Sequence, residues 1–240
     1  MTGRPQGGQA RRPMKTYEIG KAICRWVLAP LLTRMHVEGR DNIPKEGPFF
    51  LVPNHQSILD PLMIQAFCSR RVHSMTKSTQ FGSPVMYWLL PRIGAFPARR
   101  YRTDPQCVRT VLRLLEDGEG VGIYAEGERS WDGRMQPFRR GTIRLILKAG
   151  VPIIPVGITG SYDVWPRWSK RPRRASVRIR YGEPIELGRH DDRAERETAV
   201  ESTTTLLRAR IRELMGTAGA APPAGAPASN PAAASAGMVP

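Results

Sequence analysis

The chain has 240 residues, enough to bury a large apolar core as one large domain or two small ones. Its 40% hydrophobic and 24% charged residues match folded globular domains, which excludes a wholly disordered or fibrous protein. The 37 lysines and arginines against 21 acidic residues give a net charge of +16, which favours nucleic acid, an anionic membrane or phosphorylated substrates as partners.

The two ends of the chain differ in composition from its middle. Residues 1–13 are rich in Gly, Gln, Arg and Pro and are predicted to form a disordered arm, and residues 216–240, rich in Ala and Pro without any charge, a disordered tail. Residues 14–35 are predicted to form an amphipathic helix, and residues 36–215 the folded domain. The helix could pack on a core, but Trp26 and its basic neighbours also suit a helix lying in a membrane surface.

Within the middle region, strand-like and helix-like segments alternate. The predicted strands are 49–52, 71–76, 93–99, 121–125, 151–158 and 176–181. The predicted helices are one beginning at residue 60, followed by 83–90, 104–118, 138–149 and 191–215. This alternation predicts an α/β fold: a single domain with a mixed, largely parallel sheet flanked by helices.

The clearest candidate for chemistry is a histidine that directly follows the first predicted strand, in Asn54-His55-Gln56-Ser57-Ile58-Leu59-Asp60. Ligand sites in α/β sheets form at the carboxyl ends of strands. His55 could act there as a general base, with Asp60 fixing its tautomer. Two simpler explanations stay open: Asp60 before Pro61 suits a helix N-cap, and His55 could be an ordinary loop histidine.

The same heptapeptide resembles the first signature of the glycerolipid acyltransferases, the 1-acylglycerol-3-phosphate acyltransferase family and its lysophospholipid-acyltransferase relatives. Three further blocks follow in the order typical of that family, and together the four blocks make the resemblance specific over roughly residues 35–185. The further blocks are Gly94–Arg100, with an arginine six residues after a glycine; Tyr124–Ser130, similar to Phe-Pro-Glu-Gly-Thr-Arg-Ser; and Val151–Val156, an apolar strand with a proline.

This resemblance implies an O-acyltransferase. The family moves a fatty acyl group from a thioester, on coenzyme A or acyl carrier protein, to the free hydroxyl of a lysophospholipid such as 1-acylglycerol 3-phosphate. It implies His55 as the general base and Asp60 as its orienting partner. No cofactor beyond the thioester co-substrate is expected. No metal is expected either, because Cys24, Cys68 and Cys107 lie far apart without metal-ligand spacing, which also favours a reducing compartment.

The resemblance also implies the residues that bind substrate. Arg100 and Arg129 occupy the family positions for the acceptor phosphate, and Lys77, after the predicted strand 71–76, is a further candidate. Glu126 and Gly127 are expected to shape the acceptor pocket.

Two positions depart from the family pattern. Ala125 replaces the common proline, and Glu128 replaces the common threonine and adds a negative charge beside the expected phosphate site, which nearby basic residues could offset. Other alcohol acceptors, such as glycerol 3-phosphate or a glycolipid, therefore stay open.

A second basic region suggests how the protein meets its amphiphilic substrates. It contains Arg167, Lys170, Arg171, Arg173, Arg174, Arg178 and Arg180, beside Trp165 and Trp168. A solvated loop would explain this basic region, but the region also suits binding to an anionic membrane surface. The sequence has no apolar run of about 18 residues, the length that a membrane span needs. We therefore expect peripheral binding at the cytoplasmic face of the cell membrane. A basic nucleic-acid-binding protein is the alternative from another class, although no nucleic-acid-binding motif is present and no nucleic acid partner is expected.

Overall fold

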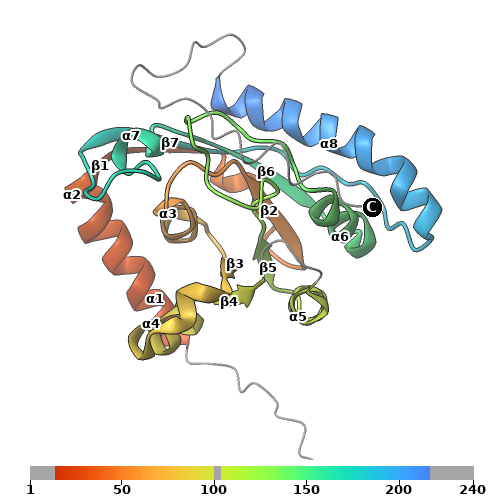
Figure 1. Cartoon of the computed structure of the whole chain (residues 1–240), viewed down its shortest axis with the longest axis horizontal. Coiled ribbons are helices and arrows are strands. Elements are labelled where there is room, and N and C mark those ends of the chain that lie inside the picture. The colour runs from red at the N-terminus through yellow and green to blue at the C-terminus, as the bar shows by residue number, and fades with distance from the viewer. Residues whose placement is uncertain (1–13, 100–103, 217–240) are drawn as a thin grey trace, which may run out of the picture.

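The computed structural model describes residues 14–99 and 104–216. The predicted arm, the tail beyond Gly216 and the candidate Arg100 lie outside the described residues. In the described ranges, seven strands form one sheet in the order β1-β7-β6-β2-β5-β3-β4 (Figure 1). The strands are β1 (Thr33–Glu38), β2 (Phe49–Pro53), β3 (Val72–Lys77), β4 (Ala95–Ala98), β5 (Gly120–Gly122), β6 (Ile153–Thr159) and β7 (Ala175–Tyr181). Neighbouring strands are parallel except for β6 and β7, which confirms the predicted mixed, largely parallel sheet.

Helices connect these strands and cover both faces of the sheet. The α-helices are α1 (Met14–Ile23), α2 (Ala29–Leu32), α3 (Asp60–Phe67), α4 (Pro84–Leu89), α5 (Pro105–Glu116), α6 (Arg140–Ala149), α7 (Ser161–Val164) and α8 (Arg193–Met215). All five helices predicted after residue 36 are present, with ends shifted by a few residues. Among the described residues, no helix is both long enough and apolar enough to cross a membrane.

The central strand β2 is buried on both faces, and its side chains alternate between two cores. Phe49 and Leu51 pack with α3 and with β6 and β7, whereas Phe50 and Val52 pack with α5, α6 and α8. In Figure 1, α3 and α1 accordingly lie across the sheet from α5, α6 and α8. A strand buried on both sides reads as an unbroken apolar run, which is why the sequence revealed it clearly.

Helix α8 lies directly on β6 because position 157 is glycine. A Cβ at Gly157 would approach the backbone carbon of Leu214 to 2.7 Å, closer than real Cβ contacts allow. The absence of a side chain there lets the last turn of α8 contact the strand backbone. The carboxyl half of α8 is thus fixed against the strand that neighbours β2.

The predicted helix 14–35 is wrong at its C-terminal end. Helical structure runs from α1 through a π-helical turn at Cys24–Leu28 to α2, and Thr33 then turns extended and begins β1. Residues 33–38 alternate in burial, as a strand with one covered face does, and pair in parallel with β7. The apolar helical pattern upstream hid this period-two signal.

Two other segments differ from the expected elements. The predicted strand 93–99 begins only at Ala95, because Leu90–Ile93 is a 3-10 helix ended by Gly94 in the left-handed region at φ 82°. The predicted strand 121–125 ends at Gly122, and the chain then turns into the loop that carries Glu126. The short helix α7 was not predicted from the sequence.

Candidate active site

His55 lies in the loop that follows β2, at the edge where five parallel strands end. Those strands are β6, β2, β5, β3 and β4. Asn54 fixes the start of this loop against β6: its Nδ2 donates to the carbonyl oxygen of Ile158 (2.9 Å), and its Oδ1 accepts from the Ile158 N–H (2.7 Å). This structural role of Asn54 was not evident from the motif alone.

The structure brings the two predicted catalytic residues together. Nδ1 of His55 lies 2.9 Å from Oδ2 of Asp60, and the side chains are 9% and 0% exposed. The same oxygen accepts hydrogen bonds from the N–H groups of Gln56 (2.6 Å) and Ser57 (2.7 Å). Because a carboxylate oxygen can only accept hydrogen bonds, Nδ1 is the donor in this contact, and in a neutral imidazole the lone pair is then on Nε2.

The interpretation of Asp60 as only a helix cap is wrong. Leu59 occupies the N-cap position of α3, and no side chain there accepts a capping hydrogen bond. The Asp60 carboxylate instead points back to the loop before the helix. Pro61, in the first turn, has no N–H to satisfy, which reduces the need for a cap.

The ring of Tyr124 contacts the imidazole of His55. Their centroids lie 4.0 Å apart and their planes are tilted by 31°. Burial of the phenol, reinforced by the negative charge of Asp60, raises the pKa of Tyr124 well above its usual value, so the hydroxyl is neutral at pH 7. Tyr124 was not predicted from the sequence as a site residue, although the phenylalanine usual at this family position indicates an aromatic residue.

Glu126 connects the loop after β2 to the loop after β5. Its Oε1 accepts from the N–H of His55 (2.8 Å) and its Oε2 from the N–H of Gln136 (2.7 Å). Burial raises the pKa of Glu126 to about 8, although the two N–H donors act in the opposite direction. Glu126 therefore holds the backbone of His55 in place, and its part in shaping an acceptor pocket stays a prediction.

Gly127 allows an arginine to lie against the loop backbone. It adopts φ 75°, and a Cβ there would overlap Nε and Cδ of Arg139. Arg139 also lies 3.7 Å from Oε1 of Glu128, the position that departs from the family pattern. Arg139 was not predicted from the sequence, because its proximity depends on how the loop 127–139 folds back.

Two of the three remaining candidates, Arg129 and Lys77, lie in loops or strand ends along the same edge of the sheet. Arg129 is half-buried, one residue beyond Glu128 in the third block. Lys77 is exposed at the end of β3, next to Ala98 of β4, and therefore lies two strands away from His55. Arg100 follows the end of β4 but lies outside the described residues, so its place in the site stays a prediction.

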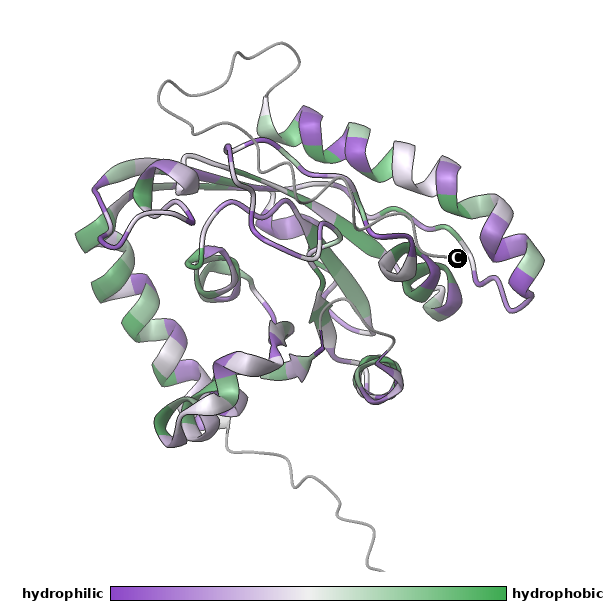
Figure 2. Ribbon diagram, viewed as in Figure 1, coloured by the Kyte–Doolittle hydropathy of each residue, from purple (hydrophilic) through white to green (hydrophobic). Residues whose placement is uncertain are grey.

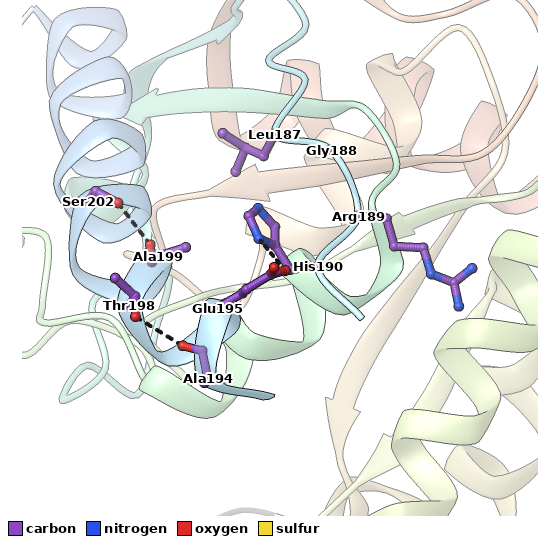
Figure 3. Close-up of a pocket in the computed structure, with 9 residues that line it drawn as sticks. All are labelled: Leu187, Gly188, Arg189, His190, Ala194, Glu195, Thr198, Ala199 and Ser202. Atoms are coloured by element: carbon purple, nitrogen blue, oxygen red, sulfur yellow. Dashed lines mark hydrogen bonds and ion pairs between the residues drawn. The ribbon is translucent and has the colours of Figure 1, made fainter. Parts of the chain in front are cut away.

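A separate hollow in the surface is unconnected to His55. It lies between the segment 187–190 and the first half of α8 (Figure 3). The backbone N–H of His190 donates to the carbonyl oxygen of Leu147, near the end of α6. Because α6 leads into the start of β6, the hollow lies at the edge of the sheet opposite to His55. No residue of the four motif blocks lines this hollow.

Comparison with known proteins shows the family to which the chain belongs. A family model described as "Acyltransferase" matches residues 34–159, more than half of the chain. This range includes His55, Asp60 and the third and fourth blocks. The chain therefore belongs to the acyltransferase family, and the resemblance seen in the sequence is confirmed.

Individual relatives make the similarity more specific. The chain is 30% identical over 153 residues to the chloroplastic 1-acyl-sn-glycerol-3-phosphate acyltransferase BAT2 of Brassica napus, covering 62% of this chain but only 44% of that protein. It is 26% identical over 192 residues to the 1-acyl-sn-glycerol-3-phosphate acyltransferase of Bacillus subtilis, covering 78% of this chain and 92% of that protein. The crystal structure of the 1-acyl-sn-glycerophosphate acyltransferase PlsC from Thermotoga maritima matches with a TM-score of 0.65 and 26% identity, over 84% of this chain and 78% of that one.

The raised pKa of Glu126 predicts how stability depends on pH. In the unfolded chain this carboxyl loses its proton near its ordinary pKa of 4.5, whereas in the folded protein it keeps the proton up to about pH 8. The contribution of Glu126 to the free energy of unfolding is therefore fully present below pH 4.5 and is lost as the pH rises to about 8, with a slope of at most about 1.4 kcal/mol per pH unit.

Glu126→Gln should remove this slope, as urea unfolding of both proteins between pH 5 and 8 would reveal. Glu116→Gln, which removes an exposed carboxylate on α5, is the matched control. Parallel pH profiles for the wild type and Glu126→Gln would contradict the raised pKa.

Proposed function

We propose that the protein is an O-acyltransferase that moves a fatty acyl group from a thioester to the hydroxyl of 1-acylglycerol 3-phosphate, giving phosphatidate. The observation that carries this proposal is the contact between His55 and the buried carboxylate of Asp60, at the sheet edge where α/β proteins bind ligands. The names of the relatives support the reaction and the acceptor. Coenzyme A and acyl carrier protein both remain candidate carriers of the acyl group.

The geometry suits base catalysis by His55. A neutral hydroxyl is a poor nucleophile, so a base must take its proton as the oxygen attacks the thioester carbonyl. With its proton on Nδ1, His55 presents Nε2 for that purpose, and the Asp60 carboxylate stabilises the imidazolium that forms. When the tetrahedral intermediate breaks its carbon–sulfur bond, the departing thiolate takes the proton back from His55.

We further propose that the protein binds the membrane peripherally, at its cytoplasmic face. The segment 14–32 packs Tyr17, Cys24 and Ala29 inward but leaves a row of apolar side chains exposed. The row consists of Ile19, Ile23, Trp26, Val27 and Leu31, which are 50–74% exposed, and its apolar colour is visible along α1 and α2 in Figure 2. Exposed apolar residues in a continuous row mark an interaction surface more often than scattered ones do.

This surface approaches the same edge of the sheet as His55. Because β7 runs antiparallel to β6, and β1 parallel to β7, both β1 and β7 begin at the edge where β2 and β6 end. Helix α2 leads into β1, and the basic segment 167–174 leads into β7, so both approach the edge that carries His55. Helix α4 follows the end of β3 and exposes Val85, Tyr87 and Trp88.

We predict that His55→Ala lowers acyl transfer by about 10²–10⁴-fold while the protein still folds, because no other group replaces the base. Release of free thiol from acyl-CoA with 1-acylglycerol 3-phosphate as acceptor measures this loss. Asp60→Asn should also lose most activity, since an amide holds the imidazole in the wrong tautomer. His36→Ala, at an exposed histidine of β1, is the control, and near-normal turnover by folded His55→Ala would contradict the mechanism.

Arg100→Ala and Arg129→Ala should act mainly on acceptor binding. A charge-assisted hydrogen bond contributes about 1.5–3 kcal/mol, so the KM for the acceptor should rise about tenfold or more, whereas the KM for the thioester changes much less. Steady-state kinetics with each substrate varied in turn separate the two effects. Arg109→Ala, at an exposed arginine of α5, is the control. A larger rise in the thioester KM would instead place these arginines on the acyl donor.

Binding to vesicles tests the membrane proposal. We expect the protein to float with vesicles that contain anionic lipid, and salt to weaken this binding, because each basic residue near the surface contributes about 1 kcal/mol. Trp26→Ser combined with Leu31→Ser should lower partitioning at least about tenfold, since two exposed apolar side chains are lost. Leu206→Ser, at an exposed leucine of α8, is the matched control. Equal flotation with neutral and anionic vesicles at low salt would contradict the electrostatic contribution to binding. Unchanged flotation of the double variant would contradict the apolar contribution.

A further inference from the structure

Glu128 brings a negative charge into the third block, yet the structure surrounds it with arginines. Oε2 of Glu128 lies 2.8 Å from a terminal nitrogen of Arg167, and its Oε1 lies 3.7 Å from Arg139. The side chain of Glu128 is 19% exposed and that of Arg167 is 24% exposed. At this partial burial, the attraction between opposite charges is stronger than on an open surface.

Arg167 makes further contacts in the same region. The nitrogen that binds Glu128 also donates to the carbonyl oxygen of Arg129 (3.3 Å), and the guanidinium lies 3.7 Å from the centre of the Trp131 ring. The chain around Arg167 is held close to the catalytic loop, because Ser57 donates from its hydroxyl to the carbonyl oxygen of Trp165 (3.0 Å). Arg167 thus connects the basic segment 167–174 to the backbone of Arg129.

Position 167 lies beyond the residues that the family model matches, which end at 159. The nearer of the two arginines around Glu128 therefore comes from outside the matched range. An unpaired carboxylate next to Arg129 would repel a phosphate group that Arg129 binds, whereas an ion-paired carboxylate would not.

We propose that Arg167 is a positioning residue for the acceptor phosphate: it cancels the charge of Glu128 beside Arg129. The inference rests on the proposed function, in which the acceptor carries a phosphate. It predicts that the loss of Arg167 lowers the affinity for the acceptor only while Glu128 is charged, and only when the acceptor carries a phosphate.

A double-mutant cycle tests this coupling. The proteins are the wild type, Arg167→Gln, Glu128→Gln and the double variant, with Arg113→Gln at an exposed arginine of α5 as control. Each full-length protein is titrated calorimetrically with a short-chain 1-acylglycerol 3-phosphate and, separately, with the monoacylglycerol of the same chain, which lacks the phosphate. Acyl transfer to the phosphorylated acceptor is measured in parallel.

Arg167→Gln should weaken binding of the phosphorylated lipid about tenfold and that of the monoacylglycerol less than about twofold. Adding Glu128→Gln should return the affinity for the phosphorylated lipid to within about threefold of Glu128→Gln alone. Equal losses for both lipids would show a merely structural role, and an uncorrected loss in the double variant would show that charge cancellation is wrong; either result overturns the proposal.

The proposed function can fail separately. A wild type that binds the phosphorylated lipid without acylating it would overturn the acyl-transfer function, while the binding cycle still decides the role of Arg167. A wild type that does not bind the phosphorylated lipid at all would overturn both.

Discussion

One oxygen of Asp60 accepts hydrogen bonds from the N–H groups of Gln56 and Ser57 and faces Nδ1 of His55. Because Asp60 is fully buried, its charge depends on these donors for solvation. The loop must therefore fold back over the start of α3, and the imidazole must present Nδ1 to the carboxylate. The same set of contacts fixes the loop, the tautomer and the direction of Nε2, which are the conditions that a general base requires.

The loop itself is held by contacts with β6 and with the loop that follows β5. Asn54 binds the backbone of β6, Glu126 binds the N–H of His55 from the loop after β5, and the N–H of Ser130 donates to the carbonyl oxygen of His55 (2.8 Å). Each contact links the end of β2 to the end of a neighbouring strand. The position of His55 thus depends on the parallel arrangement of the central strands, and any change in their register would move the imidazole.

The sequence predicted the parts of the fold that have local signals. Each of these signals spans only a few neighbouring residues: the unbroken apolar run of β2, the Asp-Pro pairs at the start of α3 and α5, and the spacing of His55 and Asp60. The strand β1 was missed because its pairing with the distant β7 overrides a helical pattern that continues up to it. Arg139 and Arg167 were not assigned to the site for a similar reason, since each reaches it only through a loop that folds back in three dimensions.

The antiparallel pairing of β6 with β7 has a consequence for the whole molecule. If β7 ran parallel to β6, the strand pair β1 and β7 would begin at the far edge of the sheet, away from His55. As observed, the exposed apolar row that precedes β1 and the basic segment that precedes β7 both approach the edge that carries the site. An acceptor with a long acyl chain need not leave the bilayer fully when the membrane-facing surface and the catalytic base share one edge. The reversal of one strand pair therefore connects the fold to the proposed use of a membrane-bound substrate. Arg167, in that basic segment, contacts Glu128 and the backbone of Arg129 and so links the segment to the third block.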